Sequence, residues 1–443
     1  MRVVIAVHHF PPDYTGGAEL RALRTATGLQ ARSHDVCIVC VERIDARGNC
    51  SLTWRDEVYE GIPVRRLSFD LAAAPDPSRW EYENPWVGQH LREYLARLGP
   101  DAVHLISGYL MSGSAPQAAI DLSIPVVVTL TDFWFLCPRI ILMCSDRSLC
   151  TRPADPPACA LCLRKEKRRY RLPDQLTGGW VGKALVYYWR GSNDQLLHAL
   201  IERRKYLLSL LERADAVISP SRFLKRLFES EGVSPRRFVL MRQGLDVDRW
   251  VAAQPKATDT CLRVGYIGQI ASHKGVDILV DAFCRLRTNE EQQRAQLVLY
   301  GDAEQFPRFT QRLRKIIGDR KEILLAGRFD HGQIRRIHAD LDLLVVPSLW
   351  YENSPNVILE AFACGTPVVV SRLGGMTELV SDGVNGLHFE AGNAKDLARV
   401  LQRFVDEPDL RANLQRGIEP VKTVQQEMEE LLEVYGAVCD RAR

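Results

Sequence analysis

Residues 347–367 read Pro-Ser-Leu-Trp-Tyr-Glu-Asn-Ser-Pro-Asn-Val-Ile-Leu-Glu-Ala-Phe-Ala-Cys-Gly-Thr-Pro. The apolar run 343–346 in front of this stretch predicts a buried strand. Ser354 and Pro355 predict the start of a helix, because an N-cap residue is followed by proline at the first helical position. Gly365 predicts the helix end, and the apolar run after it predicts a second, parallel strand.

Two glutamates occupy defined places in this pattern. Glu352 follows the carboxyl end of the strand, and Glu360 lies in a helix whose neighbouring residues are almost all apolar. A carboxylate on a buried helix is costly unless it accepts hydrogen bonds. The donors are either protein groups or the hydroxyl pair of a ligand, and the helix N-terminus suits an anion such as a diphosphate. The spacing leaves both alternatives open.

The same strand-and-helix alternation runs through the chain twice, on either side of a polar stretch at 252–260. We therefore expect an α/β protein with two doubly wound, Rossmann-like domains facing across a cleft. The expected N-terminal domain covers 1–245 and the C-terminal domain 246–422. The helix expected over 423–443 packs back on the N-terminal domain.

The composition is that of a soluble globular protein, with 46% hydrophobic and 26% charged residues among 443. A net charge of +3 does not indicate a nucleic-acid partner. The first apolar strand is too short for a signal peptide, and no run of eighteen apolar residues predicts a membrane span. We expect a cytoplasmic protein.

Three glycine turns each follow an expected strand, at Gly16-Gly17, at 268–275 and at Gly374-Gly375. Glycines allow backbone N–H groups to approach a phosphate, and each turn opens a helix. Lys274 lies in the second turn, where an ammonium group would neutralise a diphosphate. A single turn of this kind is ordinary in α/β proteins, and the three together with Glu352 and Glu360 are more specific.

These motifs resemble the retaining, nucleotide-sugar-dependent glycosyltransferases of family 4 (group 1), which have the two-domain GT-B fold. The resemblance covers nearly the whole chain, and Glu352-x7-Glu360 is its strongest motif. It implies that Glu360 binds the ribose hydroxyls and that Glu352 holds the donor sugar. It also implies that Lys274 stabilises the leaving diphosphate, which itself deprotonates the acceptor.

The resemblance implies three catalytic residues, namely Glu352, Lys274 and His104. The predicted donor-binding residues are Gly16, Gly17, Gln269, Lys274, Arg328, Asn353, Ser354, Asn356, Val357 and Glu360. His104 matches a family position at a strand end, and a structural histidine is the alternative there. Asp246-Val-Asp248 has the spacing of a metal-binding Asp-x-Asp, but its place between domains favours coincidence. We expect no catalytic metal.

Two residues depart from the family pattern. Gln269 stands where many relatives have arginine, and Thr131 stands where relatives often have histidine before Asp132. One phosphate-binding cation and one donor-sugar contact are therefore missing. Arg372 or Arg328 is a candidate to replace the cation.

A proline-rich insert over 137–162 contains five cysteines. A subset of the family has a similar insert with cysteines matching Cys137, Cys150, Cys159 and Cys162. Four thiolates form structural zinc or iron–sulfur sites, and free thiols are the alternative. Disulfides are the least favoured option in a reducing compartment.

A basic run at 164–171 precedes an apolar stretch at 180–189 that begins and ends with tryptophan. Such a combination suits an anionic membrane surface, here the inner face of the membrane. A solvated basic face beside a core segment is the alternative.

The sequence therefore predicts a retaining, metal-independent hexosyltransferase of polysaccharide biosynthesis. It would transfer a sugar from a nucleotide diphosphate sugar to a hydroxyl acceptor that is a lipid-linked or polysaccharide intermediate. One alternative is a catalytically weak GT-B protein that binds nucleotide sugars as an assembly partner. The other is a nucleotide-sugar epimerase, although such epimerases lack the Glu-x7-Glu motif.

Overall fold

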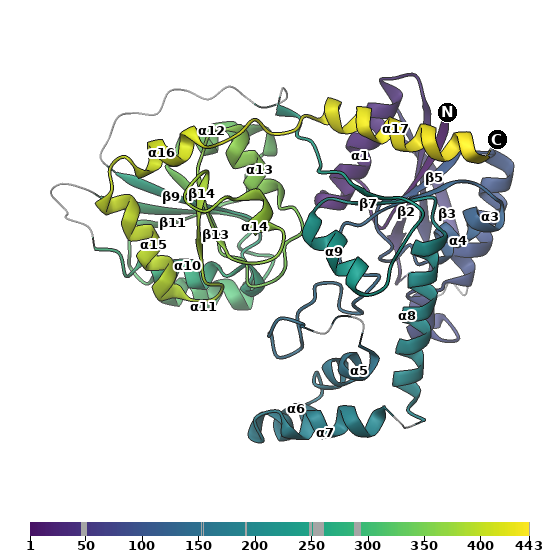
Figure 1. The fold of residues 1–443 in the computed structure, drawn as a ribbon, viewed down its shortest axis with the longest axis horizontal. Coiled ribbons are helices and arrows are strands. Elements are labelled where there is room, and N and C mark those ends of the chain that lie inside the picture. Colours follow the sequence, from purple (N-terminus) through teal and green to yellow (C-terminus); the bar gives the residue numbers. More distant parts are fainter. Residues whose placement is uncertain are drawn as a thin grey trace. The chain divides into compact units, whose positions relative to one another are not determined.

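The computed structural model describes residues 1–45, 51–151, 153, 155–190, 193–247, 250, 261–287 and 294–442. The expected linker at 252–260 and Asp248 lie outside the described residues. The chain divides into two compact units. The N-terminal unit contains 1–243 together with 424–443, and the C-terminal unit contains 244–423 (Figure 1).

The C-terminal unit is built on six parallel strands in the order β11-β10-β9-β12-β13-β14. The strands are β9 Leu262–Ile267, β10 Ala295–Tyr300, β11 Ile323–Gly327, β12 Leu343–Val346, β13 Val368–Ser371 and β14 Gly386–Phe389. The strand order reverses between β9 and β12, which pair directly with Leu343 opposite Val264. Ligands of doubly wound sheets bind beyond the carboxyl ends of the strands at such a reversal.

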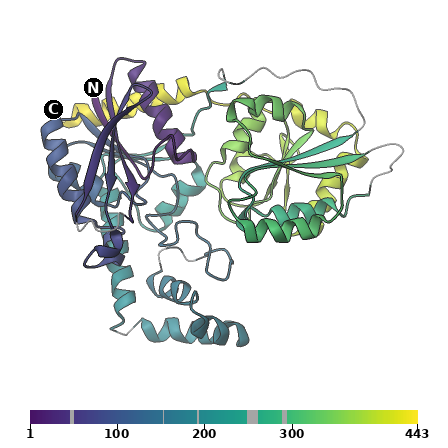
Figure 2. The same cartoon turned by 180° about the vertical axis from the view of Figure 1, so that it is seen from behind.

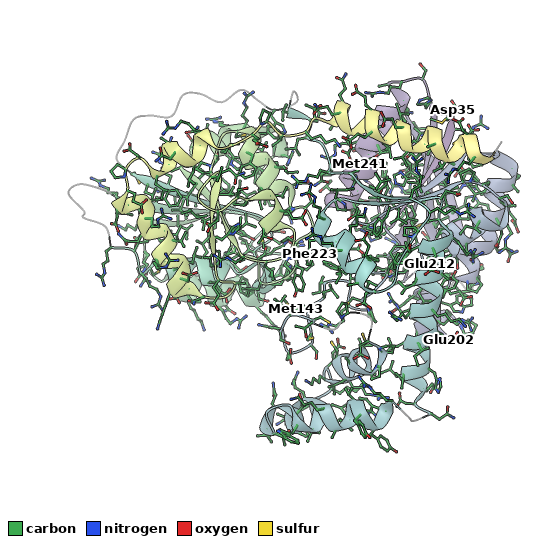
Figure 3. All side chains as sticks on the ribbon, viewed as in Figure 1. Asp35, Met143, Glu202, Glu212, Phe223 and Met241 are labelled. Carbon is green, nitrogen blue, oxygen red and sulfur yellow. The ribbon has the colours of Figure 1, made fainter. Side chains whose placement is uncertain are left out.

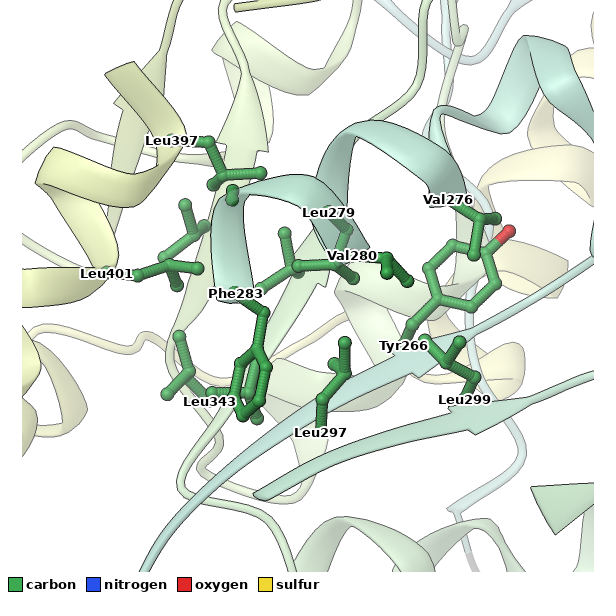
Figure 4. Packing of buried hydrophobic residues seen from close by; sticks show 14 of the residues in the cluster. Tyr266, Val276, Leu279, Val280, Phe283, Leu297, Leu299, Leu343, Leu397 and Leu401 are labelled. Atoms are coloured by element: carbon green, nitrogen blue, oxygen red, sulfur yellow. The ribbon is translucent and has the colours of Figure 1, made fainter. Parts of the chain in front are cut away.

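Helices cover both faces of this sheet. They are α10 Val276–Phe283, α11 Pro307–Ile317, α12 Ile334–Ala339, α13 Asn356–Ala363, α14 Met376–Leu379, α15 Ala394–Asp406 and α16 Leu410–Arg416, with short 3-10 turns η3 Ser272–Lys274 and η4 His331–Gln333. Val345 belongs to one apolar core and Leu344 to another, because successive strand residues face opposite ways. Figure 4 shows Leu279 and Phe283 of α10 packed over Leu297 in the first core.

The helix α13 begins one residue later than its sequence predicts. Pro355 is the N-cap and Asn356 the first helical residue, and no side chain caps the helix. The assignment of Ser354 as N-cap is therefore wrong, because proline with ψ of 120° is still extended at position 355.

The N-terminal unit has eight strands in the order β3-β4-β2-β1-β5-β6-β7-β8, all parallel to their neighbours except β3. They are β1 Arg2–Val7, β2 Asp35–Arg43, β3 Thr53–Tyr59, β4 Ile62–Ser68, β5 Ala102–Leu105, β6 Val126–Thr129, β7 Ala216–Ser219 and β8 Phe238–Leu240. Sequence reasoning missed β3, because this edge strand is polar and largely exposed. The view from behind in Figure 2 shows the same sheet from its other side.

Helices around this sheet include α17 from the end of the chain. They are α1 Gly17–Gln30, α2 Pro77–Trp80, α3 Pro85–Leu98, α4 Ser114–Asp121, α8 Gln195–Arg213, α9 Arg222–Ser230 and α17 Val424–Ala442, and η1 Leu71–Ala73 is a 3-10 turn. Met428 and Tyr435 of α17 are buried in the core of the N-terminal unit. Arg21 of α1 binds Glu427 of α17 at 2.9 Å.

The insert after β6 forms three helices, α5 Pro156–Arg164, α6 Arg168–Leu176 and α7 Trp180–Trp189. They share a small apolar core with the first half of α8, which includes Leu161, Trp189 and Leu200. The helix α8 then runs toward the sheet, so that Glu212 lies nearer the sheet than Glu202 (Figure 3).

Candidate active site

The strand reversal brings two loops of the C-terminal unit together. The loop after β9 leads into η3 and Lys274, and the loop after β12 leads to Glu352. The two loops touch at Gly275, where a Cβ atom would lie 2.0 Å from the carbonyl oxygen of Pro347. Gly275 also has a φ of +68°, so any side chain there would strain the backbone as well.

Glu352 accepts three hydrogen bonds at one oxygen. Lys274 Nζ donates to Oε1 at 2.7 Å, and Ser348 Oγ and Trp350 Nε1 each donate to it at 2.8 Å. Burial raises the pKa of Glu352, but the charge of Lys274 and these hydrogen bonds outweigh burial and hold the pKa below its ordinary value. All bonds from described residues to this carboxylate fall on Oε1, which leaves Oε2 as an acceptor.

Trp350 also holds the lysine. Lys274 Nζ lies 4.7 Å from the centre of the Trp350 ring, and the His273 ring packs against that tryptophan edge-on at 5.3 Å. Burial and the neighbouring Lys274 lower the pKa of His273 to about 4, so this histidine is neutral at physiological pH. Sequence reasoning missed Ser348, Trp350 and His273. Ser348 and Trp350 follow the strand β12, and His273 precedes Lys274. These positions were the sequence signal that could have identified them as site residues.

The glycine turn at Gly374-Gly375 supports the loop that carries Glu352. The N–H of Gly375 donates to the carbonyl oxygen of Glu352 at 2.7 Å. A Cβ atom at Gly375 would lie 1.9 Å from the carbonyl oxygen of Asn353. Close backbone packing therefore explains this glycine, in addition to any contact with a phosphate.

Glu360 lies on α13 and is 6% exposed. Its Oε1 lies 2.8 Å from Nε2 of His331, a residue that the sequence did not point to. The side chain of His331 is 56% exposed, so it reaches the carboxylate from the solvent side. A protein donor for the buried carboxylate is therefore present, and binding of ribose hydroxyls by Glu360 remains a prediction.

The other predicted donor-binding residues of the C-terminal unit are distributed around these loops. Asn353, Ser354, Asn356 and Val357 are partly buried at the start of α13. Gln269 is exposed, and its carbonyl oxygen accepts a hydrogen bond from Tyr266 at 2.7 Å.

The two arginines considered as replacement cations are engaged in ion pairs. Arg328 is 79% exposed and pairs with Asp302, which follows β10. Arg372 lies 4.0 Å from Asp382. Lys274 is therefore the cation that the structure places beside Glu352.

In the N-terminal unit, Gly16 is the N-cap of α1 and Gly17 is the first residue of that helix. A Cβ atom at Gly16 would meet the Glu19 carboxylate at 2.6 Å, whereas Gly17 has open space around it. Glu19 pairs with His8 at 3.2 Å. Both follow β1, at the strand end where this sheet also reverses its order, and sequence reasoning gave neither residue a role of its own.

Asp132 lies at the same edge of the N-terminal sheet. Its Oδ1 accepts a hydrogen bond from the N–H of Trp134 at 2.8 Å, and Ser107 Oγ lies 3.4 Å from Oδ2. Burial raises the pKa of the Asp132 carboxyl. The edge therefore carries the His8 imidazole and the Glu19 carboxylate after β1, the Ser107 hydroxyl after β5 and the Asp132 carboxyl after β6.

His104 lies in the core and not at this edge. Its side chain is buried, with Nδ1 2.6 Å from Tyr435 Oη and Nε2 2.7 Å from Thr129 Oγ1. Burial, and to a lesser extent Arg21, lowers the pKa of His104 to about 3. Both ring nitrogens are used in joining β5 to β6 and α17. This buried position fits the structural alternative for His104 better than the predicted catalytic role.

The five cysteines of the insert line one cavity of about 230 Å³. The thiols of Cys150 and Cys162 hydrogen-bond to Cys144, which lowers the pKa of Cys144 and raises that of Cys162. Cys144 was absent from the predicted ligand set, although it stands between two of the predicted ligands in the sequence. Within the described parts of the chain, no group of three or more His, Cys, Asp or Glu residues is arranged to hold a metal ion. A structural zinc or iron–sulfur site remains a prediction.

Both units match known protein families. Residues 16–244 match the glycosyl transferase 4-like domain, and residues 250–419 match glycosyl transferases group 1. The chain belongs to the group 1 glycosyltransferases. This group 1 glycosyltransferase is 26% identical to a glycogen synthase of Mycobacterium tuberculosis over 92% of its own length and 87% of that protein.

Solved structures show the same fold. Sucrose-phosphate synthase from Thermosynechococcus elongatus aligns over 99% of both chains with a TM-score of 0.66 and 17% identity. HepE of Anabaena, in complex with UDP-glucose, aligns over 99% of this chain and all of that one, with a TM-score of 0.64 and 18% identity. The group 1 glycosyltransferase therefore has two Rossmann-like domains of the GT-B class. Among its described helices, none has the length and apolar character needed to cross a bilayer.

Proposed function

We propose that this group 1 glycosyltransferase transfers a hexose, with retention, from a nucleoside diphosphate sugar to a hydroxyl acceptor. The observation that carries the proposal is the Lys274–Glu352 pair at the strand reversal of the C-terminal unit. The complex of HepE with UDP-glucose supports a nucleotide-sugar donor.

Lys274 would stabilise the leaving diphosphate. An ammonium group has three N–H donors, and one of them is used by Glu352 at 2.7 Å. The remaining donors can bind phosphate oxygens as negative charge develops on them, which is the interaction that lowers the barrier. Glu352 would orient the lysine through Oε1 and accept a hydroxyl of the donor sugar at Oε2.

Glu360 would hold the other end of the donor. Its burial keeps a carboxylate acceptor in a fixed place, and His331 reaches it from the exposed side. We propose that ribose hydroxyls take the place of His331 when the donor binds. Backbone N–H groups at the start of α13, from Asn353 to Val357, would then face the phosphates.

The acceptor we propose is a lipid-linked or polysaccharide intermediate, reached by a protein that associates peripherally with the inner face of the membrane. The glycogen synthase relative supports a glycan acceptor. The leaving phosphate would deprotonate the acceptor hydroxyl, and catalysis would need neither a metal ion nor a protein nucleophile.

The test is an assay of the purified protein with uridine-, guanosine- and adenosine-diphosphate hexoses and glycan or lipid acceptor extracts. We expect free nucleoside diphosphate from one donor, dependent on acceptor and unaffected by a chelator, and an anomeric configuration in the product that matches the donor. Inversion in the product would overturn retention. Donor binding without turnover, with every acceptor tried, would favour a nucleotide-sugar-binding assembly partner.

A further inference from the structure

The second half of the insert exposes large apolar side chains. Trp180, Tyr187 and Tyr188 of α7 are 77%, 82% and 71% exposed, and Leu176 at the end of α6 is 85% exposed. The spacing of 180, 187 and 188 places these three side chains on one side of the helix. Lys183 lies on the same side and is also exposed. We call these five residues the hairpin face.

The opposite side of α7 is fully used in packing. Val186 and Trp189 are buried in the small core of the insert. Asp174 of α6 is buried, accepts a hydrogen bond from the N–H of Gly182 at 2.7 Å and pairs with Lys165. The two helices are thus held together by their inner sides, and the hairpin face turns outward. Figures 1 and 2 place α6 and α7 at the end of the insert farthest from the sheet of this unit.

The same segment concentrates positive charge. Residues 164–190 contain eight Lys or Arg and two Asp or Glu, a net charge of +6 in a chain whose total is +3. Both acidic residues are engaged in ion pairs, Glu166 with Arg139 and Asp174 with Lys165. Lys167, Arg168 and Arg169, at the start of α6, are exposed.

We propose that the hairpin face docks on an anionic lipid bilayer. Tryptophan and tyrosine have an apolar body and a polar tip, which suits the level of the lipid headgroups, and the cations beside them attract anionic lipids. A helix of ten residues is about 15 Å long and too short to span a bilayer, so α7 would lie in the plane of the interface. The role of this docking rests on the proposed lipid-linked acceptor, whereas the docking itself is measured without donor or acceptor.

The experiment is co-sedimentation of the full-length protein with vesicles of phosphatidylcholine and phosphatidylglycerol, compared with phosphatidylcholine alone. We expect binding to the anionic vesicles that weakens as salt is raised. Joint replacement Trp180→Ser, Tyr187→Ser and Tyr188→Ser should weaken binding about tenfold or more. Joint replacement Lys167→Gln, Arg168→Gln and Arg169→Gln should weaken it by roughly fivefold for each cation.

Matched controls separate docking from loss of folding. Replacement of the same three aromatic residues by phenylalanine should retain vesicle binding. Trp54→Ser with Val58→Ser removes exposed apolar side chains from β3, and should leave binding unchanged.

Two results would overturn the proposal. One is wild-type protein that does not bind anionic vesicles, or binds neutral vesicles equally well. The other is a triple serine variant that retains vesicle binding but loses self-association in size-exclusion chromatography, which would make the hairpin face an interface between copies. Nucleotide-sugar turnover with a water-soluble acceptor should persist in all variants, so a failure of docking is distinguishable from a failure of the proposed reaction.

Discussion

Lys274 and Glu352 are 78 residues apart in the sequence, and their side chains meet at 2.7 Å. The pair forms because β9 and β12 are neighbours in the sheet, so the loops that follow them share one edge. Glu352 is charged in this setting, since its pKa is held below the ordinary value against the effect of burial. The pair is therefore a preformed ionic contact.

Lys274→Ala should reduce turnover more than donor binding, because charge builds on the leaving phosphate during the reaction. We expect kcat to fall by about 10²–10³-fold, as for loss of one group that stabilises developing charge. Steady-state kinetics with the identified donor measure both parameters. Lys395→Ala, which removes an exposed cation from α15, is the matched control. Equal losses in kcat and in donor affinity would contradict the leaving-group role.

Glu360→Gln should weaken binding of the nucleoside diphosphate by about 10–100-fold, because a hydrogen bond to a charged acceptor becomes a neutral one. Isothermal titration calorimetry measures the dissociation constant of the nucleoside diphosphate. His331→Ala removes the present partner of Glu360 and should leave affinity the same or higher, since ribose hydroxyls no longer compete with the histidine. Unchanged affinity in Glu360→Gln would show that ribose does not bind there.

Gly375→Ala should displace the loop at Glu352, because the added Cβ atom would lie 1.9 Å from the carbonyl oxygen of Asn353. We expect a lower Tm together with weaker donor binding. Gly436→Ala in α17 is the control, since a Cβ atom there meets nothing within 4 Å. That variant should be neutral or more stable by up to about 1 kcal/mol. Differential scanning calorimetry with and without nucleotide tests both, and a fully active Gly375→Ala would be inconsistent with the packing argument.

His104 should make the N-terminal unit less stable in mild acid. Its pKa is lowered to about 3 by burial, whereas an unfolded chain has the ordinary value of 6.5, so the unfolded state binds more protons between these limits. The contribution of neutral His104 to the free energy of unfolding is therefore complete above pH 6.5. It decreases by about 1 kcal/mol when the pH falls one pH unit below that value. Denaturant unfolding between pH 5 and 8 should show a shallower pH dependence for His104→Gln. His198→Gln, at an exposed histidine, should retain the wild-type pH dependence.

Cys144 should be the most reactive thiol of the insert if the site holds no metal, because hydrogen bonds from Cys150 and Cys162 lower its pKa. If the insert holds a structural metal, Cys144 should be unreactive in freshly purified protein. A structural metal would give zinc or iron by elemental analysis, protection of the cluster from alkylation, and modification of Cys144 once a chelator is added. Peptide mass spectrometry locates the modified thiol, and Cys284 outside the insert serves as the reference. Neither zinc nor iron, with immediate alkylation of Cys144, would overturn the metal prediction.

The local features of the fold could be read from the sequence. Periods of apolar residues identified both strand-and-helix series, and glycines after strands identified the turns, because these signals depend on neighbours along the chain. The polar edge strand β3 had no such apolar signal. The helix start at Asn356 was misplaced by one residue, since Ser-Pro is compatible with more than one capping arrangement.

The residues of the candidate site could be predicted only in part from the sequence. Glu352 and Glu360 stand out because each is a carboxylate at an apolar helix or its entry, and the structure places Glu352 after β12 and Glu360 on α13. Their partners Lys274 and His331 come from other strand ends, and no pattern within residues 347–367 identifies them.

The sequence by itself determined the β/α repeats, the glycine turns and the position of each carboxylate on its own element. Only the tertiary structure decided which elements are neighbours. That choice placed Lys274 beside Glu352, buried His104 against Tyr435 from a helix 331 residues away, and brought Cys144 to Cys162. The physical reason is that periodicity reports how a segment is buried, whereas strand order is set by packing between segments distant in the chain.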